Sequence, residues 1–243
     1  MAYTPPAPTS DCDACNAPGF YLNAAALYLN SAASDSDYDG DWDFGARVGV
    51  GFERPDGLFY EIEGFWYEGE GDDSSDPFVQ YDSEIYAIDF LIGDNLHCGE
   101  ACLDLAFGLR YASFELTGTR NEPDPQTPPP GFNGTRTLAD FDGWGPTVQL
   151  EGTRSLGGPW SLYGELQQSI LFGDIKVDEK ISRERDALAF VTEIAGGVQY
   201  DLAAMMGGVS GAHVRLGGEG QYWVIDGNDF GLYGAALSVG FTF

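Results

Sequence analysis

Hydrophobic and polar residues alternate strictly along the last stretch of the chain. In Gly231–Phe243, one face collects the apolar residues Tyr233, Ala235, Leu237, Val239, Phe241 and Phe243, and the other collects Gly234, Ala236, Ser238, Gly240 and Thr242. Because side chains of a β-strand point to opposite faces in turn, this pattern predicts a strand with one apolar, aromatic face and one small, polar face.

The same alternation recurs along the chain and predicts about ten strands, with eight or twelve as alternatives. Trp42–Glu53 and Leu58–Tyr67 show it most clearly, because each places all its charged residues on one face. The expected strands lie at about 19–30, 42–53, 58–67, 84–93, 103–112, 139–153, 160–171, 188–200, 212–224 and 231–243.

Strands that are apolar on one face and polar on the other are typical of a barrel in a membrane. Such a barrel faces lipid with its apolar side, and only a closed sheet satisfies every backbone group there. No apolar run approaches the ~18 residues of a spanning helix. The sequence therefore predicts an all-β fold, a transmembrane antiparallel up-and-down β-barrel over residues 19–243, preceded by a flexible arm over residues 1–18 that is rich in Pro, Ala and Ser.

The segments between these strands predict two sets of connections. One set comprises the acidic or irregular segments 31–41, 68–83, 116–138, 173–187 and 225–229. The other set comprises 54–57, 94–101, 154–159 and 201–211. The first set is longer, apart from 225–229. Outer-membrane barrels have long extracellular loops and short periplasmic turns, so we expect both termini in the periplasm.

The charge of the chain limits its partners. Its formal net charge of −28 argues against nucleic acid, because a phosphate backbone requires Lys and Arg. Met1–Pro5 lacks the charged and apolar regions of an export signal, and we expect either a processed form with an added Met or a chain from which the signal was trimmed.

Four cysteines form two close pairs, Cys12 with Cys15 and Cys98 with Cys102. Two short disulfides, cross-links between the pairs, free thiols and a four-thiolate zinc site are all compatible with this spacing. An oxidising periplasm favours disulfides.

The inward face of the predicted barrel carries eight acids and three arginines. They are Arg47, Glu61, Glu63, Asp89, Asp104, Arg110, Glu151, Glu165, Glu193, Arg215 and Glu219. A barrel of about ten strands is close to the size at which side chains fill the interior. Two interpretations follow: a narrow water path that prefers cations, or a network of salt bridges that plugs the barrel.

One acidic segment resembles the start of a calcium loop. Asp35, Asp37, Asp39 and Asp41 precede position twelve, where a bidentate Glu is expected but Ala46 stands. We expect Ca²⁺ to bind there weakly if at all, the alternative being a solvated acidic loop, and we expect no other cofactor.

Two other function classes are alternatives to a porin-like barrel. A soluble lipocalin-like barrel binding a small apolar ligand would need its apolar face inward. An outer-membrane barrel enzyme would need a base near the extracellular rim, but His97 and His213 both fall at the predicted periplasmic end. We therefore expect no catalytic residues.

Several short pieces resemble known outer-membrane barrels. The aromatic ending resembles the terminal strand of that class, in which the last Phe, here Phe243, belongs to the signal read by the barrel-assembly machinery. Phe107-Gly-Leu-Arg-Tyr111, Gly143-Trp-Gly-Pro146 and Gly218-Glu-Gly-Gln-Tyr-Trp223 resemble the pore-forming Legionella major outer-membrane protein type. The resemblance implies a Gram-negative outer-membrane location, contact with lipid and lipopolysaccharide, and an ion-transporting pore. The oligomeric state is not implied.

The apolar faces predict membrane-protein behaviour in solution. We expect the protein to partition into detergent and to migrate differently on gels before and after heating, because folded barrels resist detergent unfolding until heated. A monodisperse preparation free of detergent would contradict the predicted lipid-facing wall.

Overall fold

The computed structural model describes residues 18–33, 38–97, 101–120, 134–177, 183–202 and 210–243. These residues form ten strands, and none of them forms a helix long and apolar enough to cross a membrane. The strands are β1 (Gly19–Ala32), β2 (Tyr38–Glu53), β3 (Phe59–Asp73), β4 (Val79–His97), β5 (Ala101–Arg120), β6 (Gly134–Gly157), β7 (Trp160–Val177), β8 (Arg183–Asp201), β9 (Gly211–Ile225) and β10 (Asn228–Thr242).

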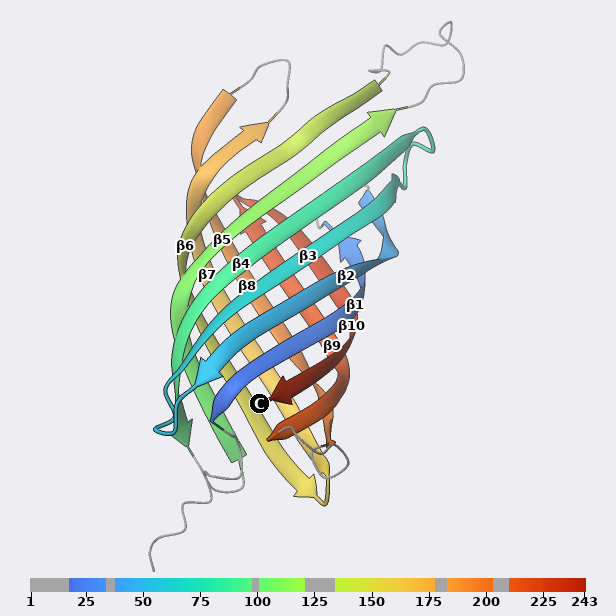
Figure 1. Ribbon diagram of the computed structural model, residues 1–243. Helices are drawn as coiled ribbons and strands as arrows, with labels where there is room; N and C mark the ends of the chain where they lie inside the picture. The colour runs from blue at the N-terminus through green and yellow to red at the C-terminus, as the bar shows by residue number, and fades with distance from the viewer. Residues whose placement is uncertain (1–17, 34–37, 98–100, 121–133, 178–182, 203–209) are drawn as a thin grey trace, which may run out of the picture.

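The ten strands form one closed antiparallel barrel (Figure 1). Each strand pairs with the next along the chain, and β1 pairs with β10 in a register that runs from Tyr21 opposite Thr242 to Ala32 opposite Gly231. This last pairing joins the two strands that would be the edges of an open sheet. The all-β, up-and-down barrel expected from the sequence is confirmed.

The two termini of the barrel lie at the same end. The backbone N–H of Phe243 donates a hydrogen bond to the carbonyl oxygen of Phe20 at 2.8 Å, next to the start of β1. We call this the terminal end and the opposite end the distal end (Figure 1).

The strands extend further toward the distal end than the sequence predicted. The expected loop 68–83 is wrong: β3 continues to Asp73 and β4 begins at Val79. The expected loops 116–138 and 173–187 are shortened in the same way, by strands that reach Arg120, Gly134, Val177 and Arg183. The strand ends also leave 74–78 between β3 and β4 but 202–210 at the terminal end, so connection length does not separate the two ends as expected.

These distal extensions have a simple physical reason. Glu68, Glu70 and Asp72 are exposed on the outer face of β3, whereas Tyr67, Gly69 and Gly71 are buried on its inner face. The alternation therefore continues with carboxylates in place of apolar residues on the outside. The high density of acids predicted a loop. Strands that extend beyond the lipid, however, are also exposed to water on their outer face and can carry acids there.

The connection between β3 and β4 is tightly hydrogen-bonded. Asp73 accepts hydrogen bonds from the backbone N–H and hydroxyl of Ser75 at 2.8 and 2.7 Å, from the N–H of Asp76 at 3.0 Å and from the Tyr81 hydroxyl at 2.8 Å. Slight burial acts to raise the pKa of Asp73, but these hydrogen bonds to its charged form hold the pKa below its ordinary value.

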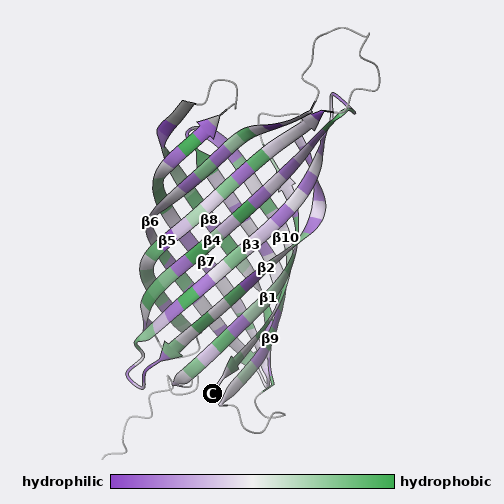
Figure 2. Cartoon of the chain, turned by 45° about the horizontal axis from the view of Figure 1, so that its top comes forward, coloured by the Kyte–Doolittle hydropathy of each residue, from purple (hydrophilic) through white to green (hydrophobic). Residues whose placement is uncertain are grey.

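The outer wall of the barrel is apolar, as predicted. Phe44 is 71% exposed, Phe107 54% and Leu237 51%, and all three point away from the lumen. Figure 2 shows hydrophobic and hydrophilic residues alternating along the strands. Opposite faces of the same strands thus meet opposite environments, as the parity of β2, β3, β5 and β10 predicted.

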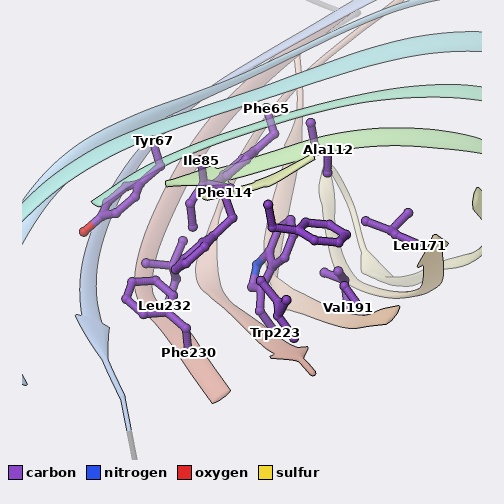
Figure 3. Packing of buried hydrophobic residues seen from close by; sticks show 14 of the residues in the cluster. Phe65, Tyr67, Ile85, Ala112, Phe114, Leu171, Val191, Trp223, Phe230 and Leu232 are labelled. Carbon is purple, nitrogen blue, oxygen red and sulfur yellow. The ribbon is translucent and has the colours of Figure 1, made fainter. Parts of the chain in front are cut away.

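The distal half of the interior is filled by apolar side chains, which the expectation of a polar lumen did not include. In Figure 3, aromatic and aliphatic residues from several strands converge. The ring of Phe114 lies 5.1 Å from the ring of Phe230 and 6.3 Å from that of Trp223, centroid to centroid. The buried members of this apolar cluster include Leu27, Leu29, Phe65, Tyr67, Ile85, Phe141, Leu171, Val191 and Leu232.

A charge on the outer wall is expected to impair folding into lipid. Val48 is 51% exposed on the outer face of β2, so Val48→Arg exposes a guanidinium to lipid and should cost about 2–4 kcal/mol if the position lies near the midplane. Val48→Leu is the matched control, since it keeps the site apolar. The measurement is urea-dependent refolding into lipid vesicles, and equal stability of the two variants would contradict the assigned orientation.

Candidate functional site

The charged residues predicted for the lumen lie on the inner face of the barrel, at and below its middle. Strand alternation places them there, and inward-facing glycines make room for their side chains. A Cβ added at Gly49 would lie 2.5 Å from Oε1 of Glu61, and one at Gly217 would lie 2.3 Å from the Tyr163 hydroxyl. Small positions on the inner face therefore alternate in space with the long polar side chains that cross the lumen.

Arg47 on β2 is the centre of the charged layer. Its Nη2 donates hydrogen bonds to Glu193 on β8 at 2.9 Å and to Glu219 on β9 at 2.6 Å. Its Nη1 lies 3.4 Å from Glu63 on β3 and 3.7 Å from Glu165 on β7. Because β7, β8 and β9 are not neighbours of β2 in the barrel, this one guanidinium ties opposite walls together.

Arg110 on β5 makes the most deeply buried ion pairs of the layer. Its Nε and Nη2 donate to the two oxygens of Asp89 on β4 at 2.8 and 2.6 Å, a bidentate arrangement, and its Nη1 donates to Glu193. The side chains of Arg110 and Asp89 are 1% and 2% exposed. Glu193 therefore accepts from both Arg47 and Arg110 and links the two arginines.

Arg215 on β9 extends the layer toward the terminal end. Its Nη2 donates to Glu151 on β6 at 2.5 Å and its Nε donates to Gln199 at 2.8 Å. The guanidinium lies 5.0 Å above the ring of Tyr163. The ion pair between Arg215 and Glu151 again crosses the lumen, because β6 and β9 are not adjacent.

Neutral polar groups join the charges to one another and to the apolar cluster. Gln149 donates to Glu165 at 2.8 Å, Gln221 donates to Glu219 at 3.2 Å, and the indole N–H of Trp223 donates to Gln221 at 3.3 Å. Gln167 donates through Nε2 to the Thr147 hydroxyl at 3.0 Å. The charged layer and the apolar cluster are thus continuous.

Sequence reasoning missed some members of this layer. The Tyr21 hydroxyl donates to Glu61 at 3.1 Å, but a run of alanines obscured the alternation of β1. Gln167 shares the inward face of β7 with Glu165, but it was missed because the predicted lumen set contained only charged residues. Trp223 is fully buried inside the barrel, where an aromatic residue was not expected.

The predicted charges differ in what they contact. Ten of the eleven take part in the hydrogen bonds and ion pairs described above: Arg47, Glu61, Glu63, Asp89, Arg110, Glu151, Glu165, Glu193, Arg215 and Glu219. Asp104, on β5, pairs in register with Glu151 on β6, closer to the terminal end. The sequence placed these residues inside, but their partners across the lumen were not predictable from it.

The calcium prediction falls partly outside the described residues. Asp35 and Asp37 lie there, whereas Asp39 and Asp41 belong to β2 and are exposed. Across the described part of the chain, no three His, Cys, Asp or Glu residues are arranged to hold a metal ion. Calcium binding by the complete segment stays a prediction.

The cysteine and C-terminal predictions are also only partly covered. Cys102 is disulfide-bonded, and Cys12, Cys15 and Cys98 lie outside the described residues, so the pairing stays a prediction. Phe243 is 62% exposed at the terminal end, and its role as an assembly signal stays a prediction.

Comparison with known proteins agrees with this architecture. The sequence pattern of the family described as "Legionella pneumophila major outer membrane protein precursor" matches residues 13–217. No curated protein matches the sequence.

Solved structures share the fold at low sequence identity. The outer membrane protease OmpT from Escherichia coli superposes with a TM-score of 0.56 at 11% identity, over 93% of this chain and 97% of that one. A major outer membrane protein from Thermus thermophilus has a TM-score of 0.49 at 12% identity, over 94% of this chain and 100% of that one.

Removing the guanidinium of Arg110 is expected to destabilise the barrel strongly. Arg110→Gln leaves the carboxylates of Asp89 and Glu193 buried with one fewer positive charge, which should cost about 3–5 kcal/mol. Arg54→Gln is the control, because Arg54 and its partner Asp56 are 47% and 57% exposed, and such pairs contribute about 0–1 kcal/mol. The free energy of unfolding in urea distinguishes the two, and similar losses would contradict the assigned role of the charged layer.

Proposed function

Since the chain belongs to the family of the Legionella pneumophila major outer membrane protein precursor, we propose that it is an outer-membrane barrel whose lumen is closed at rest. The observation that carries the proposal is the position of Arg47. Its guanidinium contacts carboxylates from four other strands and so occupies the middle of the lumen.

Two successive layers support a closed lumen. The charged layer crosses the barrel at its middle, and the apolar cluster fills the distal half with side chains such as Phe114, Trp223 and Phe230. A hydrated ion that passed the first layer would have to shed water against the second. In this proposal the membrane-embedded part of the barrel holds the distal strand extensions at the membrane surface. Any ion conduction requires the charged layer and the apolar cluster to rearrange.

A rearranged lumen would prefer cations. The predicted lumen set contains eight acids and three arginines, so loosening the salt bridges leaves carboxylates lining the path. In a confined space this surplus attracts cations and repels anions. A narrow, cation-preferring path is thus the porin-like form of the same barrel.

We place both termini in the periplasm and the distal end outside the cell. This orientation matches the export route of the class and puts the acidic outer faces of Glu68, Glu70 and Asp72 above the lipid. Outer-membrane lipid and lipopolysaccharide are then the surrounding partners, and the barrel-assembly machinery reads the C-terminal strand that ends at Phe243. We propose no nucleic-acid partner.

The two alternative functions have less support. A lipocalin-like carrier needs an apolar interior and a wetted outer wall, but Val48, Phe107 and Leu237 face outward here. Catalysis of the kind named for the Escherichia coli protease is not carried over, because that likeness concerns the fold alone. His213 and His97 both lie in the terminal-end parts of their strands, far from the distal rim where a secreted substrate would arrive.

Planar-bilayer recording tests the proposal. The unaltered protein should show no steady conductance, whereas Arg47→Ala should produce a steady current with a cation-selective reversal potential that weakens at high salt as charges are screened. Arg54→Ala, outside the lumen layer, is the control and should stay closed. Steady conductance of the unaltered protein would overturn the closed lumen, and anion selectivity of Arg47→Ala would overturn the assigned lining.

A further inference from the structure

The charged layer contains more carboxylates than its arginines contact closely. Among the described residues of this layer, the four carboxylates in closest contact with an arginine belong to Asp89, Glu151, Glu193 and Glu219. Glu63 and Glu165 reach Arg47 only at 3.4 and 3.7 Å. Glu61 has the Tyr21 hydroxyl as its hydrogen-bond donor, at 3.1 Å.

Glu61, Glu63 and Glu165 are linked as neighbours: Glu61 and Glu63 both lie beside Gly49, and Glu63 and Glu165 both approach Arg47. Measured from the position that a Cβ of residue 49 would take, Oε1 of Glu61 is 2.5 Å away and Oε2 of Glu63 is 3.8 Å away. Glu63 and Glu165 approach the same Nη1 atom of Arg47. Three carboxyl groups thus share a space that one guanidinium, already engaged through Nη2, has to neutralise.

A neighbouring amide oxygen on the same inward face is buried and able to accept a hydrogen bond. Gln167 is 1% exposed, follows Glu165 by two positions on the same inward face, and pairs in register with Glu193. Its Oε1 is buried without a hydrogen-bond partner, while its Nε2 donates to Thr147. An amide oxygen can only accept, and ionised carboxylates have no hydrogen to donate, but a protonated carboxyl group has one.

We propose that Glu61, Glu63 and Glu165 form a proton-binding group that keeps the lumen closed near neutral pH and releases it in alkaline solution. Like charges in a confined interior cannot all ionise, so protons shared among these groups remove the repulsion. Loss of the protons leaves mutually repelling carboxylates around Nη1 of Arg47 and weakens its bridge between opposite walls. The inference rests on the proposed closed lumen.

The other charged groups of the layer do not account for a response to alkaline pH. Those facing the group are Tyr21 on β1, Arg47 on β2, Asp89 on β4, Arg110 on β5, Glu151 on β6, Glu193 on β8, and Arg215 and Glu219 on β9. Arginine keeps its charge throughout the alkaline range. The four closely paired carboxylates each lie within hydrogen-bond distance of an arginine nitrogen, whereas Glu63 and Glu165 share one nitrogen of Arg47 at longer distances and Glu61 has a tyrosine hydroxyl, so the titrating change falls on these three.

The test is planar-bilayer recording of the protein between pH ~7 and ~9, about one unit below the ordinary pKa of tyrosine and further below that of lysine. The unaltered protein should be closed at the lower value and gain a steady cation-selective conductance at the upper one. The double variant Glu61→Gln/Glu63→Gln keeps the side-chain shape without the titrating group and should lose this response. Glu68→Gln/Glu70→Gln, which removes two exposed outer acids, should respond as the unaltered protein does.

The outcomes separate the two proposals. Conductance at neutral pH overturns the closed lumen, whereas a lumen that stays closed at the alkaline limit overturns only the proton-binding group. If closure of the lumen depends on which alkali cation is added and not on pH, the proton-binding group is also overturned, because the carboxylates would then bind a metal ion. Heat-modifiable migration verifies that each variant is folded, and Glu165→Gln is the second variant should the double one fail to fold; it should weaken the response.

Discussion

The constraint on which this structure depends is that lipid offers no hydrogen bonds to a polypeptide backbone. Every N–H and C=O of the spanning strands must find a partner within the protein, and the pairing of β1 with β10 makes this possible for the first and last strands. Closure in turn separates an inside from an outside. The two-residue period of a strand then places alternate side chains in two different solvents, and Val48 and Arg47 become opposite in role although they are adjacent in sequence.

A second constraint is that a barrel of ten strands encloses little free space, so side chains fill its interior. The charged layer at the middle and the apolar cluster in the distal half fill it in different ways. Arginines satisfy buried carboxylates through contacts that cross the lumen, whereas aromatic rings such as those of Phe114 and Phe230 fill volume without any charge to neutralise. The hydrogen bond from Trp223 to Gln221 connects the two layers.

The distal extensions show how the environment, more than the strand itself, selects the residues. Along β3 the outward positions change from Ile62 and Trp66 to Glu68, Glu70 and Asp72, while the backbone pairing with β4 continues to Asp72 opposite Gln80. The change marks the level at which lipid gives way to water. A segment that is dense in acids can therefore be a wetted strand, and the hydrogen-bonded turn at Asp73 is the only irregular part between β3 and β4.

The sequence by itself determined the fold class, a count of about ten strands and the face on which each clear strand carries its charges. These follow from local alternation, which needs no knowledge of distant residues, and the terminal strand and β2 illustrate it best. The interior location of the eleven lumen charges was predictable for the same reason. Only the tertiary structure decided that Arg47 bridges to Glu193 and Glu219, that Arg110 shares Glu193, and that the distal interior is apolar. Those contacts join strands that are distant both in the chain and around the barrel, and they depend on the register and stagger of all ten strands, which alternation along one strand does not encode.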